Sequence, residues 1–226
     1  MKKIAFYTVF TGNNNTSGYA IPQAQEGFDN YFFTNNETLF NILKDTQWIP
    51  KLITERSGDD YIASTMDSKR LKVNPFLSED LSNYEFTCFR DTKIDSLSLS
   101  KVLDIIKDNS YAMALIEHWF LEPEVYAEFN ESMLQPRYKS QEDQILSYIR
   151  RMESEGLSLK TSYHLACGFI IRNMKHKDVE RIGKTWQEHI NECGIQDQIS
   201  MFFVKQLFDR QCFRTLKSAD VYNTNM

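Results

Sequence analysis

Hydrophobic residues in the first quarter of the chain occur in short continuous runs, which are typical of strands buried on both faces of a sheet. The first run is Lys3 to Thr11, and the polar segment GNNNTSG at 12–18 follows it. The second is Phe28 to Thr34. The third, Trp48 to Thr54, contains Pro50, which favours a sheet edge. These runs predict three strands of one sheet.

The stretch YEFTCFRDTKID, from Tyr84 to Asp95, predicts a fourth strand that ends in charged residues. Asp91 follows the last aromatic residue of this run. In open α/β sheets, ligands bind in the crevice beyond the carboxyl ends of the strands. A carboxylate at that position can hold a divalent cation against a diphosphate. The alternative is an ordinary strand followed by a polar turn.

Apolar residues farther along the chain recur at helical spacing and alternate with further apolar runs. The predicted helices are 37–44, 96–108, 125–133, 142–155, 179–193 and a last one opened by Asp197 as its N-cap; the predicted strands are 111–120 and 163–172. The basic run at 67–73 is either a solvated helix face or a phosphate-binding segment. This order predicts an α/β fold, with one mixed Rossmann-like sheet flanked by helices in a single domain. The domain spans 1–216, and 217–226 is expected to be a frayed polar tail.

Composition narrows the class of protein without identifying it. The 226 residues carry a net charge of -5, which gives no support for a nucleic-acid partner. The four cysteines have no metal-binding spacing and are expected to be free buried thiols. No apolar run is long enough for a transmembrane segment, and the N-terminus lacks the features of a signal peptide. We therefore expect a cytoplasmic protein.

The order of short motifs along the chain resembles glycosyltransferases of the GT-A fold. It is similar in particular to plant mucilage- and pectin-related transferases and to chlorovirus capsid-glycosylating enzymes. The matching positions, in order, are Tyr7, Thr8, Phe10 and Gly12; Phe32 to Asn35; Trp48; Ser68, Lys69, Lys72 and Pro75; Tyr84, Phe89 and Asp91; His118; Gly168 and Ile170 to Arg172; Trp186; and Asp197, Gln198 and Ser200. Two departures are Asn35, where the family pattern has Asp, and Gln196, where it has Arg.

The resemblance implies transfer of a sugar from a nucleoside diphosphate sugar, such as a UDP-sugar, to a glycan or glycoprotein acceptor. The sugar would be a hexose or deoxyhexose. The implied donor-binding residues are Thr8, Phe10, Gly12, Asn35, Lys69, Lys72 and Lys93.

The implied cofactor is Mn²⁺ or Mg²⁺, which neutralises the departing diphosphate as a Lewis acid. Asp91 is the predicted ligand, and the second carboxylate of a D-x-D pattern is missing because Lys93 stands in its place. Asp95 is a candidate to fold back and replace that carboxylate. Alternatively, Lys93 lends its own charge to the phosphates.

An inverting transfer needs a base that accepts the proton of the attacking hydroxyl, whereas retention needs none. Asp197 is the first candidate and Glu117 the reserve; the other reading of Asp197 is a helix cap. His118 is either a residue of the metal or acceptor side of the site or a structural, hydrogen-bonded histidine. For His164, the structural role is favoured. Gln198 is expected to line the site.

Two other classes stay open. One is a non-catalytic nucleotide- or carbohydrate-binding module on a degenerate transferase fold, which the missing carboxylate and Asn35 favour. The other is a nucleotidyltransferase, which usually requires two carboxylates and a basic residue in its glycine-rich N-terminal loop. The segment at 12–18 has no basic residue.

Overall fold

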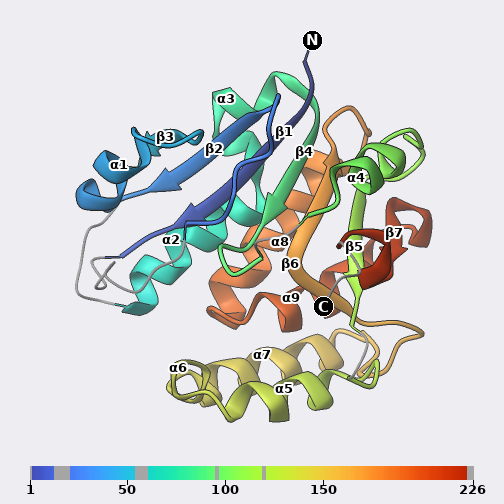
Figure 1. Cartoon of the computed structure of the whole chain (residues 1–226). Helices are drawn as coiled ribbons and strands as arrows, with labels where there is room; N and C mark the ends of the chain where they lie inside the picture. Colours follow the sequence, from blue (N-terminus) through green and yellow to red (C-terminus); the bar gives the residue numbers. More distant parts are fainter. Residues whose placement is uncertain (1, 13–20, 54–60, 95–96, 119–120, 223–226) are drawn as a thin grey trace.

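The computed structural model describes residues 2–12, 21–53, 61–94, 97–118 and 121–222, and its centre is a seven-stranded sheet (Figure 1). The spatial order of the strands is β3-β2-β1-β4-β6-β5-β7. In chain order they are β1 Lys2–Phe10, β2 Asp29–Thr34, β3 Ile49–Leu52, β4 Tyr84–Arg90, β5 Met113–Glu117, β6 Leu165–Asn173 and β7 Phe213–Leu216. The predicted α/β fold with a mixed sheet is confirmed, and β3, which carries Pro50, lies at the edge as expected.

The directions of the strands place several strand ends at one edge of the sheet, where a ligand-binding site can form. β1 pairs in parallel with β2 on one side and with β4 on the other, so the carboxyl ends of these three strands lie side by side. Strand β6 runs antiparallel to both of its neighbours, β4 and β5. The amino-terminal end of β6 therefore lies beside the carboxyl end of β4. In open α/β sheets, this edge at the switch in strand order is where ligands bind.

Helices cover both faces of the sheet. Their bounds are α1 Glu37–Leu43, α2 Tyr61–Val73, α3 Glu79–Ser82, α4 Leu99–Ile105, α5 Val125–Met133, α6 Pro136–Lys139, α7 Glu142–Ser154, α8 Val179–Cys193 and α9 Asp197–Val204. On one face, α2, α8 and α9 bury Val73, Trp186 and Val204 against Tyr7 and Phe89 of the sheet. On the other face, α4 and the last described residues pack against the opposite side chains of β1 and β4. Strands β1 and β4 are therefore buried on both faces, as their continuous apolar runs predict.

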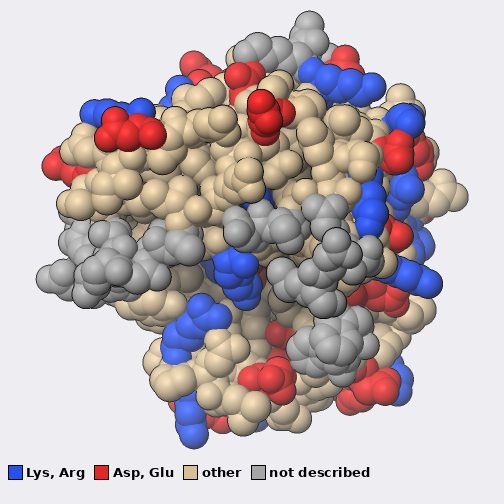
Figure 2. All heavy atoms as spheres, in the orientation of Figure 1, with Lys and Arg blue, Asp and Glu red and all other residues tan. Residues whose placement is uncertain are grey.

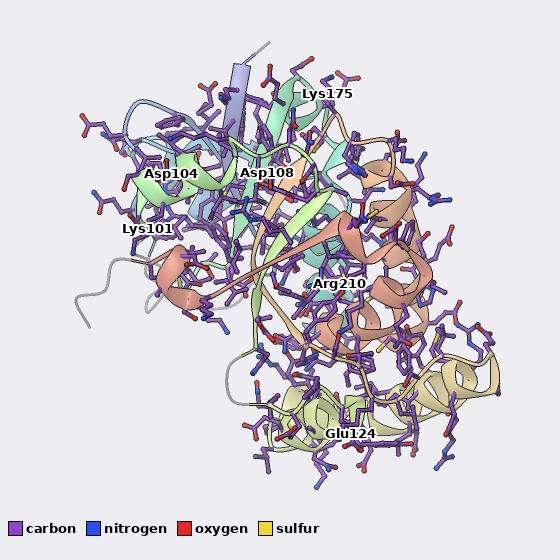
Figure 3. All side chains as sticks on the ribbon, turned by 90° about the vertical axis from the view of Figure 1, so that its right-hand side faces the viewer. Lys101, Asp104, Asp108, Glu124, Lys175 and Arg210 are labelled. Carbon is purple, nitrogen blue, oxygen red and sulfur yellow. The ribbon has the colours of Figure 1, made fainter. Side chains whose placement is uncertain are left out.

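Helices α5, α6 and α7 form a separate group beyond one end of the sheet (Figure 1). Their apolar side chains, including Phe129, Ile149 and Met152, pack against Phe202 and Phe203 of α9. Figure 3 shows Glu124, just before α5, and Lys175, just after β6, at opposite ends of the molecule. The helical group thus lies at the end of the sheet where β4 terminates, and it forms the far wall of any site there.

The structure corrects several predicted boundaries. Helix α4 is shorter than the predicted 96–108, and Ser98 stands at its N-cap position without a capping hydrogen bond from its side chain to the helix backbone. Strand β5 covers half of the predicted 111–120. The N-cap of α9 is Gln196 and not Asp197, because the Gln196 side chain accepts a hydrogen bond from the Gln198 backbone N–H. Helix α8 ends as predicted at Gly194, whose φ of 92° favours glycine.

The polar tail that was expected to fray is packed through its described part. Residues Ser218–Asp220 form a 3-10 helix, Val221 is fully buried, and Tyr222 pairs with Leu97. Charged residues in this segment hid the one apolar side chain that anchors it.

The four cysteines are free and buried, as predicted. Within the described ranges, no helix is both long enough and apolar enough to cross a membrane.

Arg172 of β6 joins the sheet to the carboxyl end of α2. Its side chain is 1% exposed and donates hydrogen bonds to the Tyr7 hydroxyl at 3.0 Å and to the carbonyl oxygen of Lys72 at 2.7 Å. The Tyr7 hydroxyl also donates to the Lys72 carbonyl, at 3.1 Å. The last turn of α2 is therefore fixed from the centre of the sheet.

We predict that Arg172→Met lowers the free energy of unfolding, because it removes the donor to the buried Tyr7 hydroxyl and one of the two donors to the Lys72 carbonyl oxygen. Each buried polar group left unpaired costs about 1–3 kcal/mol. The matched control is Arg151→Met, which removes exposed ion pairs to Glu155 and Glu192 and should cost about 1 kcal/mol or less. Urea denaturation of both variants measures the free energy of unfolding. Equal losses in the two variants would contradict a stabilising role of Arg172 between β6 and α2.

Candidate active site

Two adjoining hollows, of about 270 Å³ and about 400 Å³, lie beyond the carboxyl ends of β1 and β4. Their linings share Asp91, Lys93, Arg137, Tyr138, Gly168 and Gln198. They are therefore two lobes of one cleft. We call the smaller hollow the first lobe, which extends toward β1 and α2, and the larger one the second lobe, which extends toward α5 and the last described residues. Asp91 lies in the lining of both.

Asp91 is held at the junction of the lobes by the strand beside it. Its backbone N–H donates to the carbonyl oxygen of Gly168 at 2.7 Å. A Cβ atom on Gly168 would lie 3.1 Å from Oδ2 of Asp91, so a larger residue would push the carboxylate aside. The Asp91 side chain is 32% exposed, which leaves the carboxylate open to a ligand.

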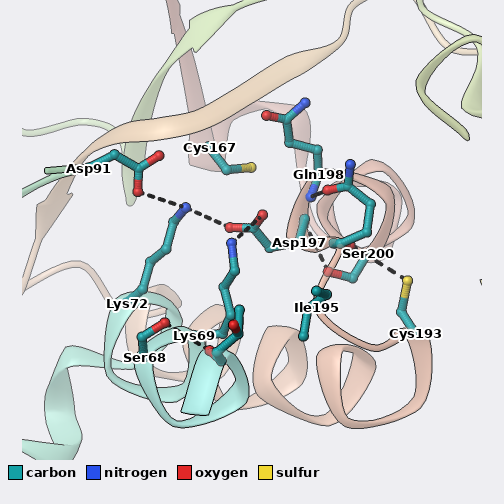
Figure 4. A network of polar contacts seen from close by, with 12 residues as sticks. Ser68, Lys69, Lys72, Asp91, Cys167, Cys193, Ile195, Asp197, Gln198 and Ser200 are labelled. Atoms are coloured by element: carbon teal, nitrogen blue, oxygen red, sulfur yellow. Dashed lines mark hydrogen bonds and ion pairs between the residues drawn. The ribbon is translucent and has the colours of Figure 1, made fainter. Parts of the chain in front are cut away.

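The first lobe contains a buried cluster of opposite charges (Figure 4). Lys69 and Lys72 project from the same face of α2, because residues three apart on a helix are neighbours. Nζ of Lys69 lies 2.9 Å from Oδ1 of Asp197, and Nζ of Lys72 lies 2.6 Å from Oδ2 of the same carboxylate. Lys72 also lies 3.6 Å from Oδ1 of Asp91. These ion pairs link α2, α9 and the end of β4.

Burial and pairing set the charges of this cluster. Burial acts against the charge of Asp197, but the two lysines outweigh it and hold its pKa far below the usual range. Burial also acts against the charge of Lys72, but Asp197 and Asp91 outweigh it and raise its pKa. For Lys69, burial prevails over the attraction of Asp197, and its pKa is lowered. Lys72 is therefore the more firmly charged of the two lysines.

The second lobe is lined by a hydrogen-bonded network around Glu128 of α5. Oε2 of Glu128 accepts from Nε2 of His164 at 2.8 Å and from Nε2 of Gln198 at 2.8 Å. Oε1 accepts from Nε2 of Gln196 at 2.9 Å and from Oγ of Ser132 at 3.3 Å. Four donors thus fix a carboxylate that is 4% exposed. The network ties α5 to α9 and to the start of β6, and it shapes the wall of the lobe.

His118 stands on the edge of this network and lines the second lobe. Its ring stacks on His164, with 5.2 Å between the ring centres, and its Nε2 lies 4.0 Å from Oε2 of Glu128. Burial lowers the pKa of His118, and the charge of Glu128 acts in the opposite direction. The ordinary pKa of histidine is about 6.5, so His118 is mainly neutral at pH 7. A neutral imidazole beside an open lobe can accept a proton.

Charged side chains follow the outline of the cleft on the molecular surface. Figure 2 shows basic side chains at the mouth of the hollow between the sheet and the lower helical group, with acidic atoms visible inside it. Among the described residues, the lining of the first lobe includes four cations, Lys69, Lys72, Lys93 and Arg137, and two carboxylates, Asp91 and Asp197. The first lobe therefore has a surplus of two positive charges and suits an anion with two negative charges.

Comparison with solved structures assigns this fold. One match is the apo structure of WbbM, a bifunctional glycosyltransferase, with a TM-score of 0.53 and 14% identity over 95% of this chain and 39% of that one. Another is the mannosyltransferase Ktr4p from S. cerevisiae, with a TM-score of 0.52 and 11% identity over 99% of this chain and 70% of that one. The chain has a glycosyltransferase fold. It spans less than half the length of WbbM.

No protein-family model matches the sequence, and no curated protein matches it. The narrower resemblance to plant and chlorovirus transferases stays a prediction from the sequence. At 14% and 11% identity, the structural likeness assigns the fold alone. The chemistry of the cleft must be argued from its own residues.

The structure brings the three predicted charged donor residues together with Phe10 and sets the remaining three predicted donor residues apart from them. Lys69, Lys72 and Lys93 line the first lobe, and Phe10 lines it from the end of β1. Thr8 is fully buried inside β1 and lines neither lobe. Because its side chain is fully buried, Thr8 does not offer a contact to a donor in this structure.

Gly12 and Asn35 stabilise the connection after β1 and are absent from both linings. The Gly12 N–H donates to Oδ1 of Asn35 at 2.7 Å, and its carbonyl accepts from Nδ2 of Asn36 at 3.1 Å. Gly12 has a φ of 112°, which favours glycine at this turn. Their contacts are those of structural residues that fix the rim of the first lobe.

The two predicted bases lie in unsuitable environments. Asp197 is enclosed by Lys69 and Lys72, and a carboxylate held between two ammonium groups has little affinity for a proton. Glu117 is exposed at the end of β5 and lines a neighbouring hollow with His118, outside the two-lobed cleft. We therefore revise both assignments: Asp197 is the counter-ion of the lysines, and Glu117 lines neither lobe.

The predicted site-lining residues divide in a similar way. His118 and Gln198 line the second lobe, as expected. His164 is 2% exposed and lies behind the wall, where it donates to Glu128. Its structural interpretation fits this position.

The described residues do not by themselves form a site for Mn²⁺ or Mg²⁺. Mg²⁺ takes about six oxygen ligands, of which one or two are protein carboxylates and the others are waters and substrate phosphates. Asp91 has the ammonium of Lys72 beside it at 3.6 Å, and within the described ranges no group of three metal-binding side chains includes Asp91. Asp95, the second predicted ligand, lies outside the described residues. A lysine ammonium beside the one carboxylate disfavours a metal ion there.

The one such group among the described residues is His176, Asp178 and Cys212, at the opposite end of the sheet. Its polar atoms are already engaged. Asp178 accepts from Arg181 at 2.8 Å and from Sγ of Cys212 at 3.8 Å, and its backbone N–H donates to Nδ1 of His176 at 3.2 Å. These contacts order the turn between β6 and α8.

Sequence reasoning missed Arg137, Tyr138 and Glu128, all from the helical group beyond the sheet. Arg137 and Tyr138 line both lobes, and Glu128 centres the second. Arg137 and Tyr138 follow Pro136, the residue that begins helix α6. A polar helical turn after a proline was the sequence feature that could have pointed to these two residues. Nothing in the spacing around Glu128 distinguishes it from the other acidic residues of α5, because its partners outside α5 come from two distant segments, at His164 and at 196–198.

We predict that Asp197→Asn destabilises the protein by about 3–5 kcal/mol, because it leaves two buried lysines without a counter-ion. The folded pKa of Asp197 is lowered, so its contribution is complete above the unfolded value of about 3.9 and is lost as the pH falls further. The folded pKa of Lys72 is raised, so its contribution is complete below about 10.4.

The difference between wild type and Asp197→Asn should therefore shrink as the pH falls below about pH 4, where the unfolded chain takes up the proton of Asp197. Urea titrations at several pH values measure it. The control Asp104→Asn removes an exposed ion pair to Lys107 and should cost about 0.5 kcal/mol or less. A penalty for Asp197→Asn no larger than that of the control would contradict the buried counter-ion.

We predict that Glu128→Gln lowers the pKa of His118 further, because it removes the negative charge that opposes the effect of burial. An NMR titration of the histidine Cε1–H signals measures this pKa in both proteins. His189, which pairs with Tyr148 far from Glu128, is the internal control and should titrate unchanged. An unchanged or raised pKa of His118 would show that Glu128 does not act on it.

Proposed function

We propose that the protein transfers a sugar from a nucleoside diphosphate sugar to the hydroxyl of a glycan or glycoprotein. The observation that carries this proposal is the two-lobed cleft, with a cationic lobe and a carboxylate- and amide-lined lobe that meet at Asp91. Its place at the carboxyl ends of β1 and β4, in a glycosyltransferase fold, supports the same conclusion. A UDP-sugar carrying a hexose or deoxyhexose is the first donor to test.

The first lobe fits the donor. Its surplus of two positive charges matches the two negative charges of the diphosphate, and lysine and arginine side chains form strong charge-assisted hydrogen bonds to phosphate oxygens. Phe10 and Tyr61 add aromatic surface at the β1 side of this lobe. The diphosphate would lie across Lys69, Lys72 and Arg137, and the sugar would point toward Asp91.

The second lobe fits the acceptor. Sugar hydroxyls are recognised by carboxylates and amides, and this wall offers Glu131, Gln135 and Gln198. Phe169 also lines the lobe and offers an aromatic ring to a sugar face. An acceptor hydroxyl here would approach the junction from the side opposite the diphosphate.

In the reaction, the bond between the anomeric carbon and the diphosphate oxygen breaks, and its electron pair leaves with the diphosphate. The acceptor oxygen forms the new bond to that carbon and loses its proton. The positive charge that develops on the sugar ring is adjacent to the Asp91 carboxylate, which stabilises it. His118, neutral at pH 7 and open to the second lobe, is the residue placed to accept the proton in an inverting transfer.

We predict that Asp91→Asn reduces the rate of sugar transfer by roughly 100-fold or more, because it removes the charge at the junction. A panel of UDP- and GDP-sugars with simple glycosides as acceptors supplies the assay, and mass spectrometry detects the product. Asp104→Asn is the matched control and should keep full activity, since its side chain is 68% exposed on α4.

Three results separate the hypotheses. Transfer that Asp91→Asn abolishes supports the proposed function. Donor binding without transfer to any acceptor would instead favour the non-catalytic module. Full activity in Asp91→Asn would contradict the role of the junction while leaving the fold unaffected.

A further inference from the structure

Lys72 is a fixed positive charge at the base of the first lobe. Its ammonium lies between two carboxylates, 2.6 Å from Asp197 and 3.6 Å from Asp91, and its side chain is 4% exposed. It also lies 5.0 Å from the ring centre of Phe89. The backbone behind it is held through its carbonyl oxygen by Tyr7 and Arg172. Both ends of this residue are therefore positioned before any ligand arrives (Figure 4).

The position of Lys72 overlaps with the place where a divalent cation would act. A metal ion bonded to Oδ1 of Asp91 at about 2.1 Å would lie within roughly 6 Å of the Lys72 nitrogen. Two cations that close repel each other, and the repulsion is strong where water is excluded. Because Asp197 holds Lys72 in place, the lysine cannot move away without breaking a buried ion pair. The chain therefore supplies a permanent positive charge beside Asp91, and the other described carboxylate of this lobe, Asp197, is already paired with Lys69 and Lys72.

We infer that Lys72, with Lys69 beside it, supplies the positive charge that stabilises the departing diphosphate, so that donor binding needs no divalent metal ion. This inference rests on the proposed function. As the bond to the anomeric carbon breaks, the electron pair moves to a diphosphate oxygen, and the two ammonium groups donate hydrogen bonds to the diphosphate without transferring a proton. Asp197 is a positioning residue, because it fixes both lysines and does not touch the donor.

Isothermal titration calorimetry of the full chain with UDP, GDP and their sugars tests the inference in wild-type protein. Each ligand is measured in EDTA and again with Mn²⁺ after EDTA removal. We expect the dissociation constant of the preferred nucleotide to agree within about threefold between the two conditions, a difference of less than 1 kcal/mol. Binding that appears only with Mn²⁺ would overturn the inference and leave the proposed function standing. Absence of binding in both conditions would overturn both.

Lys72→Met tests the residue itself, since it keeps the length of the side chain and removes the charge. In EDTA, we expect donor binding on the order of 10- to 100-fold weaker, the effect of losing one charge-assisted hydrogen bond. The control Lys184→Met removes an exposed lysine of α8 that pairs with Glu180 and should bind as wild type does. Circular dichroism verifies that each variant is folded. A folded Lys72→Met with wild-type affinity in EDTA would overturn the inference, and the wild-type comparison still decides it if this variant fails to fold.

Discussion

The ion pair between Lys72 and Asp197 is the constraint on which the cleft depends. It joins the last turn of α2 to the first turn of α9, and both helices pack on the same face of the sheet. Burying two charges is costly, and such a pair contributes less to stability than apolar packing would. Its retention at the base of a ligand-sized cleft is therefore better explained by what it positions. It holds an ammonium group beside Asp91, at the junction of two lobes.

The sequence predicted the strands more reliably than the site. The physical reason is that a buried strand is specified by neighbouring residues, whereas the site is formed by residues far apart in the chain. Continuous apolar runs identified β1, β2 and β4, because a strand buried on both faces must be apolar throughout. Asp91 could be placed from the same logic, since it follows the last buried residue of β4. The role of Asp197 could not, because a residue at a helix start has the same local pattern whether it caps the helix or pairs with lysines 125 or more positions earlier.

The second lobe was missed for a related reason. Glu128, His164 and Gln196 come from α5, the approach to β6 and the approach to α9, and only the folded chain brings them together. The Gln196 side chain illustrates the overlap of local and distant roles. Its oxygen caps α9, and its amide nitrogen donates to Glu128.

The two lobes differ in the charge of the side chains that line them. The first lobe collects cations around a fixed Lys72, and the second collects carboxylate, amide and imidazole groups around a fixed Glu128. Each central charge is buried and fully paired, so neither has to be ordered when a ligand binds, and preorganised charges stabilise a transition state without reorganising. Asp91, the residue that both lobes share, is by contrast partly open. An arrangement of two fixed charges around one accessible carboxylate suits a reaction in which a bond to an anionic leaving group breaks on one side of a sugar while a hydroxyl attacks from the other.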